Sequence, residues 1–430
     1  MKEKVKILFD AEVLVNALKK NASRSGIFFA SYQIAKALQR HPDVTFSFYC
    51  EKSKQFLLRS LDEFNEITFY PYTYISSLDS LILKCRHNKV IAKKEKRFFR
   101  KTFWHYGMLL VRLFAFVPNT CMYLLHGHEQ ENKNAIFFSP FLRFPQKIFN
   151  DSKRKKYILL YDAIPLLCPE YYPGIEKGKY WLLDVIKQLQ ADTSCHCFSI
   201  SESTKNDFLR LVPGLKPEQI TVTPLACAES FHPCPKEETI KSLQKYGLPT
   251  DKKYVFSLCS LEPRKNLIRA VKTFIEFIKK NKIDDMVFIL GGGHWEEFIG
   301  KLDAEIADLG DYKDKIIKAG YIDDEDLAPL YSGAEWFVYT SQYEGFGLPP
   351  LEAMACGCPV ITSNNSSLPE VVADAGIMID WDNDEQHIKA YEDYYNHPEL
   401  REQMRQKGLA RAKQFSWDKT ADLMVKEMLK

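Results

Sequence analysis

Two glutamates lie eight positions apart on either side of a short glycine-rich segment. Glu344 precedes the glycines of residues 345–347, and Glu352 follows in the first turn of a helix that Pro350 can open. Glycines let backbone N–H groups approach a ligand closely, and a helix N-terminus attracts an anion. The pattern therefore predicts a site for a negatively charged ligand, with carboxylates suited to accept hydrogen bonds from hydroxyl groups. The structural alternative is that Glu352 only complements the helix dipole and that the glycines only form a tight turn.

Two adjacent cations, Arg264 and Lys265, follow the end of a predicted strand at residues 254–257. Arginine offers a planar fork of donors and lysine a mobile point charge, and both suit an anionic ligand. The alternative is a solvated pair of charges at the start of a helix. Cations at a helix N-terminus oppose the helix dipole, and this favours the ligand-binding interpretation.

Two further patterns carry weaker signals. Asp324 and Asp326 form a D-x-D sequence of the kind that can bind a metal ion, but they precede a predicted helix, where acidic residues cap the first turn. Residues 291–293 are three glycines after a predicted strand, but they lack the spacing of a dinucleotide-binding loop. We expect helix capping without a metal at the first pattern and a sharp turn at the second.

These residues are carried by alternating strand-like and helix-like segments. Strands are predicted at 5–9, 44–49, 135–138, 157–161, 196–200, 220–222, 254–257, 286–290, 316–319, 336–339 and 359–361, with helices such as 27–38 and 177–190 between them. The prolines and glycine of residues 226–252 indicate a linker. Such alternation predicts an α/β chain with two doubly wound domains. Because doubly wound sheets bind ligands at the carboxyl ends of their strands, a ligand between the two domains is expected.

Composition excludes several classes of protein. A chain of 430 residues with 46% apolar residues can bury the cores of two to three domains, so it is not a disordered regulator. Its 11 cysteines are odd in number, which argues against a disulfide framework and favours a reducing compartment. The apolar run at 5–9 is too short for a signal peptide, and the one at 108–125 is interrupted by Arg112, Pro118 and Asn119. A soluble, cytoplasmic protein is expected.

The segment from Glu344 to Gly357 resembles the E-x7-E signature of retaining, nucleotide-sugar-dependent glycosyltransferases of the GT-B fold, family 4. Other segments resemble the same family in the expected order, at residues 201–205, 261–267, 320–322, 359–363, 367–371 and 415–417. The resemblance implies two Rossmann-like domains that face a cleft. Residues 1–235 would bind the acceptor, residues 236–415 would bind the nucleotide sugar, and residues 416–430 would form a helix that crosses back to the N-terminal domain.

The resemblance also implies roles for individual residues. Glu344 would contact hydroxyls of the donor sugar, Glu352 would accept both ribose hydroxyls, and Arg264 and Lys265 would stabilise the diphosphate. The full donor-binding set is Gly26, Arg264, Lys265, Ile322, Gly345, Phe346, Gly347, Leu348 and Glu352. Because these cations and the helix N-terminus can meet both phosphate charges, neither a metal ion nor a cofactor is expected.

The chain departs from the family next to the expected reaction centre. Relatives carry a His-Asp pair where this sequence has Tyr161 and Asp162, so the catalytic set becomes Glu344, Asp162 and Tyr161. Tyrosine can donate a hydrogen bond but is a poor base near neutrality, and His126 and His128 are candidate substitutes for the missing histidine. Front-side attack with retention needs no strong enzymic base, since the departing phosphate can take the acceptor proton.

Basic and aromatic residues gather at residues 84–112, which hold ten Lys or Arg and one acidic residue. Residues 1–250 contain 37 Lys and Arg against 24 Asp and Glu, whereas residues 251–430 contain 22 against 32. Positive charge interleaved with aromatic and leucine side chains is typical of a helix on an anionic membrane surface. We expect such a surface as the partner and no nucleic acid, although nucleic-acid binding and an ordinary solvated helix are the rival interpretations.

The predicted function is retaining, metal-independent transfer of a sugar from a nucleotide-diphosphate sugar to a glycan acceptor, with a lipid-linked acceptor favoured. A likeness to mannosyltransferases at residues 139–140 and 162–165 favours GDP-mannose. The protein would act in cell-surface polysaccharide or lipopolysaccharide assembly, peripherally on the inner face of the plasma membrane. One alternative is a nucleotide-sugar 2-epimerase on the same fold. The other is a non-enzymatic adaptor of a glycan assembly complex, which Tyr161 motivates and the intact Glu344, Glu352, Arg264 and Lys265 oppose.

Overall fold

The computed structural model describes residues 4–18, 26–50, 68–70, 135–172, 180–260, 262–293 and 296–430. Within these residues the strands form a seven-stranded sheet of order β3-β2-β1-β4-β5-β6-β7 and a six-stranded sheet of order β10-β9-β8-β11-β12-β13. The recorded strand pairs are parallel in both sheets. In each sheet the chain first adds strands on one side of a central strand and then returns to add strands on the other side, which is the doubly wound arrangement. The predicted α/β class is confirmed.

The first sheet is built from short apolar strands. Their bounds are β1 Val5–Asp10, β2 Val44–Tyr49, β3 Thr68–Tyr70, β4 Ile136–Ser139, β5 Lys156–Leu160, β6 His196–Ser199 and β7 Ile220–Val222. Every residue of β4 and β5 is buried, as expected for strands of a parallel sheet that helices cover on both faces. The helices in this part of the sequence are α1 Glu12–Ala17, α2 Gly26–Arg40, α6 Gln146–Phe149, α7 Ile164–Leu167, α8 Trp181–Ala191 and α9 Glu202–Leu211, with short 3-10 helices at Pro169–Tyr171 and Pro217–Gln219.

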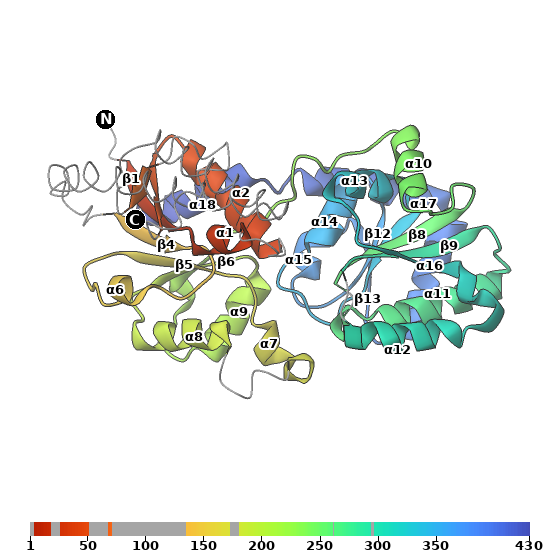
Figure 1. The fold of residues 1–430 in the computed structure, drawn as a ribbon, viewed down its shortest axis with the longest axis horizontal. Helices are drawn as coiled ribbons and strands as arrows, with labels where there is room; N and C mark the ends of the chain where they lie inside the picture. The colour runs from red at the N-terminus through yellow and green to blue at the C-terminus, as the bar shows by residue number, and fades with distance from the viewer. Residues whose placement is uncertain are drawn as a thin grey trace, which may run out of the picture. The chain divides into compact units, whose positions relative to one another are not determined.

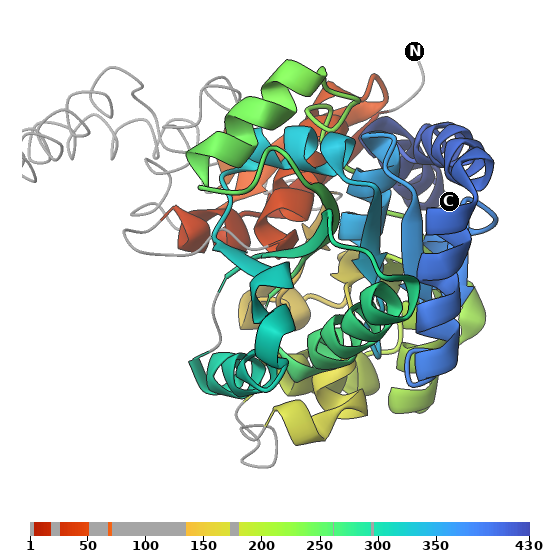
Figure 2. The same cartoon turned by 90° about the vertical axis from the view of Figure 1, so that its right-hand side faces the viewer.

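The second sheet carries most of the candidate residues. Its strands are β8 Lys253–Leu258, β9 Met286–Gly291, β10 Ile316–Gly320, β11 Trp336–Tyr339, β12 Val360–Ser363 and β13 Gly376–Ile379. The helices in this part of the sequence are α10 Lys236–Lys245, α11 Leu267–Asn281, α12 Glu296–Ala307, α13 Asp324–Gly333, α14 Leu348–Ala355, α15 Leu368–Val372, α16 Asp384–Asn396, α17 Pro398–Ala412 and α18 Trp417–Met428, with 3-10 helices η5 Pro263–Lys265 and η6 Gly310–Lys315. In Figure 1, α13 and α14 lie above this sheet and α11 and α12 lie below it. The layers can be followed from a perpendicular direction in Figure 2.

The region predicted to be a linker contains helix α10, so that prediction is wrong. Prolines precede the helix, and Pro235 ends the extended segment directly before Lys236. The helix buries Leu243, and Thr239 Oγ1 donates a hydrogen bond to the carbonyl of Pro329 in α13 at 2.9 Å. A polar surface helix with so few apolar residues leaves little periodic signal in the sequence, and packing against α13 stabilises it instead.

Strand β13 was not predicted. It begins at Gly376, a residue type depleted in strands, and only three apolar residues follow in it. A Cβ atom at Gly376 would lie 2.5 Å from Val360 Cγ2 in the neighbouring strand β12, so the close approach of the two strands requires glycine here.

The chain divides into two compact units. One comprises Met1–Leu159, Asp184–Cys197 and Ala421–Lys430, and the other comprises Leu160–Leu183 and Phe198–Thr420. Every predicted site residue except Gly26 belongs to the second unit. The domain boundaries at residues 235 and 415 stay predictions.

Three sequence-based predictions lie outside the described residues: the basic segment 84–112 and the substitute roles of His126 and His128. Among the described helices, none combines the length and the apolar character that a membrane crossing requires.

Candidate active site

The candidate site forms where two neighbouring central strands end. Strands β8 and β11 pair in parallel, with Trp336 opposite Val255. The chain leaves β8 toward η5, which carries Arg264 and Lys265, and it leaves β11 toward the loop that carries Glu344. Since parallel strands end at the same edge of a sheet, these three side chains are brought together at the point where the strand order reverses.

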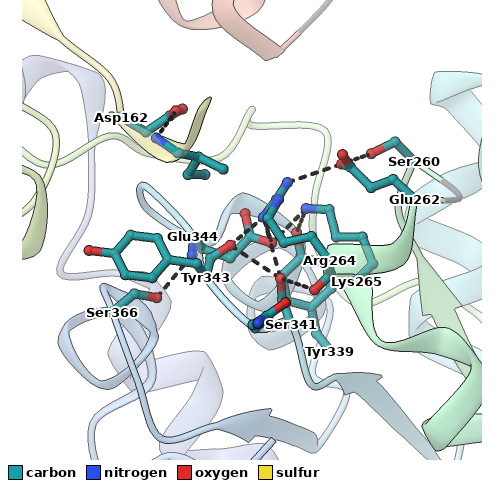
Figure 3. A network of polar contacts seen from close by, with 12 residues as sticks. Asp162, Ser260, Glu262, Arg264, Lys265, Tyr339, Ser341, Tyr343, Glu344 and Ser366 are labelled. Carbon is teal, nitrogen blue, oxygen red and sulfur yellow. Dashed lines mark hydrogen bonds and ion pairs between the residues drawn. The ribbon is translucent and has the colours of Figure 1, made fainter. Parts of the chain in front are cut away.

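The three charged side chains bind one another directly. Glu344 Oε1 accepts hydrogen bonds from Arg264 Nη1 at 2.9 Å and from Lys265 Nζ at 2.6 Å, as Figure 3 shows. All three residues are buried, with Lys265 the most exposed at 9%. Burial alone would raise the pKa of Glu344, but the charges of Arg264 and Lys265 outweigh it and lower the pKa to about 2. The interpretation of Arg264 and Lys265 as a solvated charge pair is therefore wrong.

Arg264 is held from several directions and still keeps a free donor. Its Nη2 donates to Glu262 Oε1 at 3.0 Å, and Ser260 Oγ donates to the same oxygen at 2.6 Å. Burial opposes the charge of Arg264, but Glu344 and Glu262 hold its pKa above the usual range. Within the described residues, Arg264 Nε is buried without a hydrogen-bond partner. A buried, unpaired donor on a fixed cation suits an anionic ligand.

Tyr339 is a contact that the sequence did not single out. It is the last residue of β11, and its hydroxyl oxygen lies 2.6 Å from Lys265 Nζ, which donates to it. The only signal available was its position at the carboxyl end of a central strand, where ligand-binding residues gather. Glu262 lies in the segment 261–267 that resembles the family but was given no role, and Ser260 directly precedes that segment.

The loop after Glu344 has carbonyl groups that accept hydrogen bonds, while its N–H groups have no hydrogen-bond partner among the described residues. Ser367 Oγ donates to the carbonyls of Glu344 and Phe346, at 3.0 and 2.7 Å, and Ser201 Oγ donates to the carbonyl of Gly345 at 2.7 Å. No hydrogen bond recorded in the described part of the chain uses the N–H groups of residues 345–348. These N–H groups directly precede or begin α14, so they are candidate donors for an anion at a helix N-terminus.

Both glycines of this loop are required by its geometry. A Cβ atom at Gly345 would lie 2.8 Å from the carbonyl oxygen of Tyr161 and 2.8 Å from Asp162 Cβ. Gly347 has a φ of 118°, which other residues rarely adopt, and a Cβ atom there would lie 2.8 Å from Leu368 Cδ2. The turn thus depends on close backbone approach.

Asp162 and Tyr161 lie beside the charged network. β5 ends at Leu160, so both residues follow the strand instead of Tyr161 closing it as predicted. Asp162 Oδ1 accepts a hydrogen bond from the Ile164 N–H at 3.1 Å, which Figure 3 draws apart from the network of Arg264, Lys265 and Glu344. Burial raises the pKa of Asp162, although this hydrogen bond and Arg264 act in the opposite direction. Tyr161 is buried, with 6% of its surface exposed.

Glu352 occupies the second turn of α14, as its fifth residue, and not the first turn as predicted. This position weakens the alternative that it only complements the helix dipole, because that effect is concentrated in the first turn. Tyr331 donates from its hydroxyl to Glu352 Oε2 at 3.1 Å. Burial raises the pKa of Glu352 to about 7, Tyr331 counteracts the rise and Asp324 adds to it. No cation is among the groups that shift this pKa.

The other predicted donor-binding residues have distinct environments. Leu348 is the first residue of α14, and the Phe346 ring packs edge to face against Phe415 with centroids 5.9 Å apart. Ile322 is buried, and its Cδ1 would lie 2.6 Å from a Cβ atom at Gly291. Gly26 opens α2 in the first unit, where a Cβ atom would meet nothing within 4 Å. A backbone requirement for glycine is therefore absent at Gly26.

The carboxylates that cluster at the start of α13 are not the Asp324 and Asp326 pair of the D-x-D pattern. The carboxylates close enough to share an ion are those of Asp323, Glu325 and Asp326, without Asp324. Lys245 Nζ lies 2.9 Å from Asp323 Oδ2 and 2.5 Å from Asp326 Oδ2, so an ammonium group already offsets part of their negative charge. Burial opposes the charge of Asp326, but Lys245 and its other partners lower the pKa. These ion pairs stabilise the packing of α10 against α13.

The glycine run after β9 makes a close backbone contact. Gly292 has a φ of 136°, and a Cβ atom there would lie 1.8 Å from the carbonyl oxygen of Cys259. This agrees with the prediction of a sharp turn.

Comparison with known proteins identifies the family. The family model "Glycosyl transferases group 1" matches residues 238–411. O-antigen chain mannosyltransferase B of Escherichia coli is 33% identical over 306 residues, which cover 69% of this chain and 75% of that relative. Serotype-specific mannosyltransferase WbdA of Escherichia coli is 27% identical over 273 residues, which cover 63% of this chain but only 33% of the length of that relative.

A solved structure supports the fold over nearly the whole chain. HepE of Anabaena, crystallised in complex with UDP, superposes with a TM-score of 0.63 at 14% identity, covering 99% of each chain. Identity this low supports the architecture alone. The two doubly wound sheets, the charged network at the strand ends and these matches lead to one conclusion: the chain belongs to the group 1 family of glycosyltransferases and has the GT-B fold.

Proposed function

We propose that this glycosyltransferase moves a hexose, with mannose from GDP-mannose as the favoured case, from a nucleotide-diphosphate sugar to a glycan acceptor with retention of configuration. One observation carries the proposal: Arg264 and Lys265, both buried, converge on Glu344 beside four backbone N–H groups for which the described part of the chain offers no hydrogen-bond acceptor. Two fixed cations and a helix N-terminus suit a diphosphate, and a carboxylate between them suits the hydroxyls of the sugar attached to it.

Arg264 and Lys265 would stabilise the leaving group. As the bond between the anomeric carbon and the phosphate oxygen breaks, negative charge grows on the diphosphate. Cations that are already fixed in a poorly hydrated site stabilise that charge without having to reorganise. Arg264 Nε is the unpaired donor available for this purpose. Because these groups can meet the phosphate charge, the reaction would proceed without a metal ion.

Glu344 and Glu352 would orient the donor. Both cations reach Glu344 through Oε1, so the carboxylate retains acceptor capacity on Oε2 for a sugar hydroxyl. Glu352 has one described donor, the Tyr331 hydroxyl, and can accept further hydrogen bonds from a ribose diol. The low pKa of Glu344 keeps it an anion throughout the physiological range.

Asp162 and Tyr161 would complete the reacting side of the site. In a front-side reaction the departing phosphate oxygen takes the proton of the acceptor hydroxyl, so the retaining reaction does not depend on a histidine at position 161. Burial raises the pKa of Asp162, and the negative charge of Glu344 adds to the rise. Tyr161 would contribute a hydrogen-bond donor instead of a base.

The relatives indicate the donor and the acceptor. Both Escherichia coli proteins are named as mannosyltransferases, and the first is named for the O-antigen chain. These names favour mannose as the transferred sugar and a growing surface polysaccharide as the acceptor. A lipid-linked acceptor and a place on the inner face of the plasma membrane complete the proposal, with the basic segment 84–112 as the membrane contact.

The test is turnover with a panel of donors. The purified protein is incubated with GDP-mannose, UDP-glucose or UDP-N-acetylglucosamine and with a mannose-terminated oligosaccharide on a lipid-like tail. We expect release of GDP and a product one hexose heavier, with the new bond in the anomeric configuration of the donor by NMR. Folded protein that turns over none of the donors, or a product of inverted configuration, would contradict the proposal.

The same experiment separates the two alternatives. An epimerase consumes the nucleotide sugar without an acceptor, whereas a transferase requires the acceptor for stoichiometric product. An adaptor binds nucleotide sugar or lipid without turnover. The assembled network of Glu344, Arg264 and Lys265 favours the transferase, since an adaptor has no need to hold a leaving group.

A further inference from the structure

The N-terminus of α9 supplies two hydroxyl groups to the loop after Glu344. Ser201 Oγ donates to the carbonyl oxygen of Gly345 at 2.7 Å, and Thr204 Oγ1 lies 3.2 Å from the same oxygen. Ser201 and Thr204 are 1% and 0% exposed, so water does not compete for these contacts. They belong to the segment 201–205, to which the proposed function gives no role.

Because a trans peptide bond is planar, hydrogen bonds that hold its carbonyl group also fix the direction of its N–H group. The Gly345 carbonyl and the Phe346 N–H belong to one peptide unit and point in opposite directions. The Phe346 N–H is one of the loop donors that no recorded hydrogen bond in the described chain uses. Fixing the carbonyl therefore fixes the direction of a donor that is free for a ligand.

We propose that Ser201 and Thr204 are positioning residues of the transfer reaction. Their hydroxyls orient the peptide between Gly345 and Phe346 so that its N–H faces the negative charge of the donor. This inference rests on the proposed function, because it takes residues 345–347 as part of the donor site.

Thr204 also connects the two segments that carry the reacting groups. Its Oγ1 donates to the carbonyl oxygen of Tyr161 at 2.8 Å, and this bond shares the single hydroxyl proton with the longer contact to Gly345. Tyr161 directly precedes Asp162, and Gly345 directly follows Glu344. One hydroxyl thus sets the spacing of both segments.

The first turn of α9 is itself fixed by other groups. Ser201 Oγ accepts the Thr204 N–H at 3.0 Å as a helix cap, and the Glu370 carboxylate accepts the N–H groups of Glu202 and Ser203, each at 2.7 Å. Ser201 therefore uses its oxygen as an acceptor toward the helix and its proton as a donor toward the loop. A rigid helix end is the support that precise placement of a peptide needs.

The test compares Thr204→Val, which keeps the shape but loses the hydroxyl, with Thr204→Ser, which keeps the hydroxyl. We expect Thr204→Val to lower kcat about 10-fold or more while the KM for the donor changes less, because a misdirected N–H mainly affects the charge that develops in the transition state. Thr204→Ser should restore kcat to within about two-fold of the wild type. The matched control is Thr239→Val, which removes another buried threonine bond, to the Pro329 carbonyl, between α10 and α13. It should leave kcat unchanged.

A second pair of variants covers the case in which Thr204→Val does not fold. In Ser201→Asn the amide can both accept the Thr204 N–H and donate to the Gly345 carbonyl, whereas in Ser201→Asp the carboxylate caps the helix but cannot donate. We expect the Asn variant to turn over about 10-fold faster than the Asp variant at similar melting temperatures. Equal kcat values within either pair, with an active wild type, would overturn the inference and leave the proposed function standing. A folded wild type without turnover on any donor would instead overturn the proposed function, and the inference with it.

Discussion

Lys265 Nζ and Glu344 Oε1 lie 2.6 Å apart although their residues are 79 positions apart in the sequence. The two strands that precede them are neighbours in the sheet, so the ion pair is a direct consequence of the strand order. A buried carboxylate between two cations is stable only while its partners remain, because an unpaired buried charge is costly. In the proposed function, a diphosphate offers the same two cations a second anion.

Removing both cations tests the leaving-group role. The double variant Arg264→Ala with Lys265→Ala should lower kcat roughly 100-fold or more, because the charge on the departing diphosphate loses its stabilisation. Steady-state kinetics with the identified donor measures the effect. Lys280→Ala removes a cation that is 64% exposed and paired with Glu392, and it serves as the control with wild-type kinetics. A double variant that matches the control would place the phosphates elsewhere.

Glu344 should make stability depend on pH in acid. Its pKa in the folded chain is about 2, below the ordinary value of 4.5, so its stabilisation is fully present above pH 4.5 and is lost as the pH falls through 2. The shift corresponds to about 3 kcal/mol at neutral pH. Urea unfolding at several pH values should therefore show Glu344→Gln less stable than wild type at pH 7 and nearly equal to it at pH 2.

The control for this comparison is Glu305→Gln. Glu305 pairs with Lys272 at the surface, with side chains 34% and 49% exposed, and such a pair contributes little to stability. A pH profile of Glu344→Gln that runs parallel to that of Glu305→Gln would show that the buried pair does not stabilise the fold.

The convergence of Arg264, Lys265 and Glu344 could be expected from the sequence, whereas several contacts around them could not. Arg264 and Glu344 could be assigned because each follows a recognisable strand and lies in a motif with distinctive spacing. The bond from Ser201 to the Gly345 carbonyl could not, because it joins residues 144 positions apart through a backbone atom that has no sequence signature. Helix α10 was missed for a related reason, since its stability comes from contacts with α13 that are invisible along the chain.

Activity should persist in excess chelator, because Arg264 and Lys265 supply the positive charge that a metal ion would bring. The acidic cluster before α13 gives a matched mutational test. Asp326 accepts hydrogen bonds from Ser242 at 2.7 Å and Tyr246 at 3.0 Å, so Asp326→Asn should lower the melting temperature and leave kcat unchanged. Loss of activity on chelation, restored by Mg²⁺ or Mn²⁺, would assign a metal to the reaction.

The basic segment 84–112 should bind anionic membranes. Each Lys or Arg near such a surface contributes about 1 kcal/mol, and salt should weaken the binding by screening. Co-sedimentation with anionic and neutral vesicles compares the wild type with a variant in which six cations are changed to Gln: Lys93, Lys94, Lys96, Arg97, Arg100 and Lys101. A control variant changes six lysines of the second half instead: Lys279, Lys280, Lys282, Lys313, Lys315 and Lys318. Equal sedimentation of the two variants would make the segment an ordinary solvated face.

Donor binding should strengthen as the pH rises through about 7 because of Glu352. Burial places the pKa of its carboxyl at about 7 in the empty site, so near neutrality a large share of the molecules carries the protonated form. Ribose hydroxyls donate to the ionised form, which lowers the pKa in the complex, and binding below pH 7 must therefore release a proton.

Calorimetry of GDP-mannose without acceptor, in buffers of different ionisation enthalpy, measures that proton. The intact nucleotide sugar is the right probe because its diphosphate does not titrate in this range. Glu352→Gln should bind more weakly at pH 8, with no pH dependence between 6 and 8, and a wild type with the same flat profile would remove Glu352 from the ribose site.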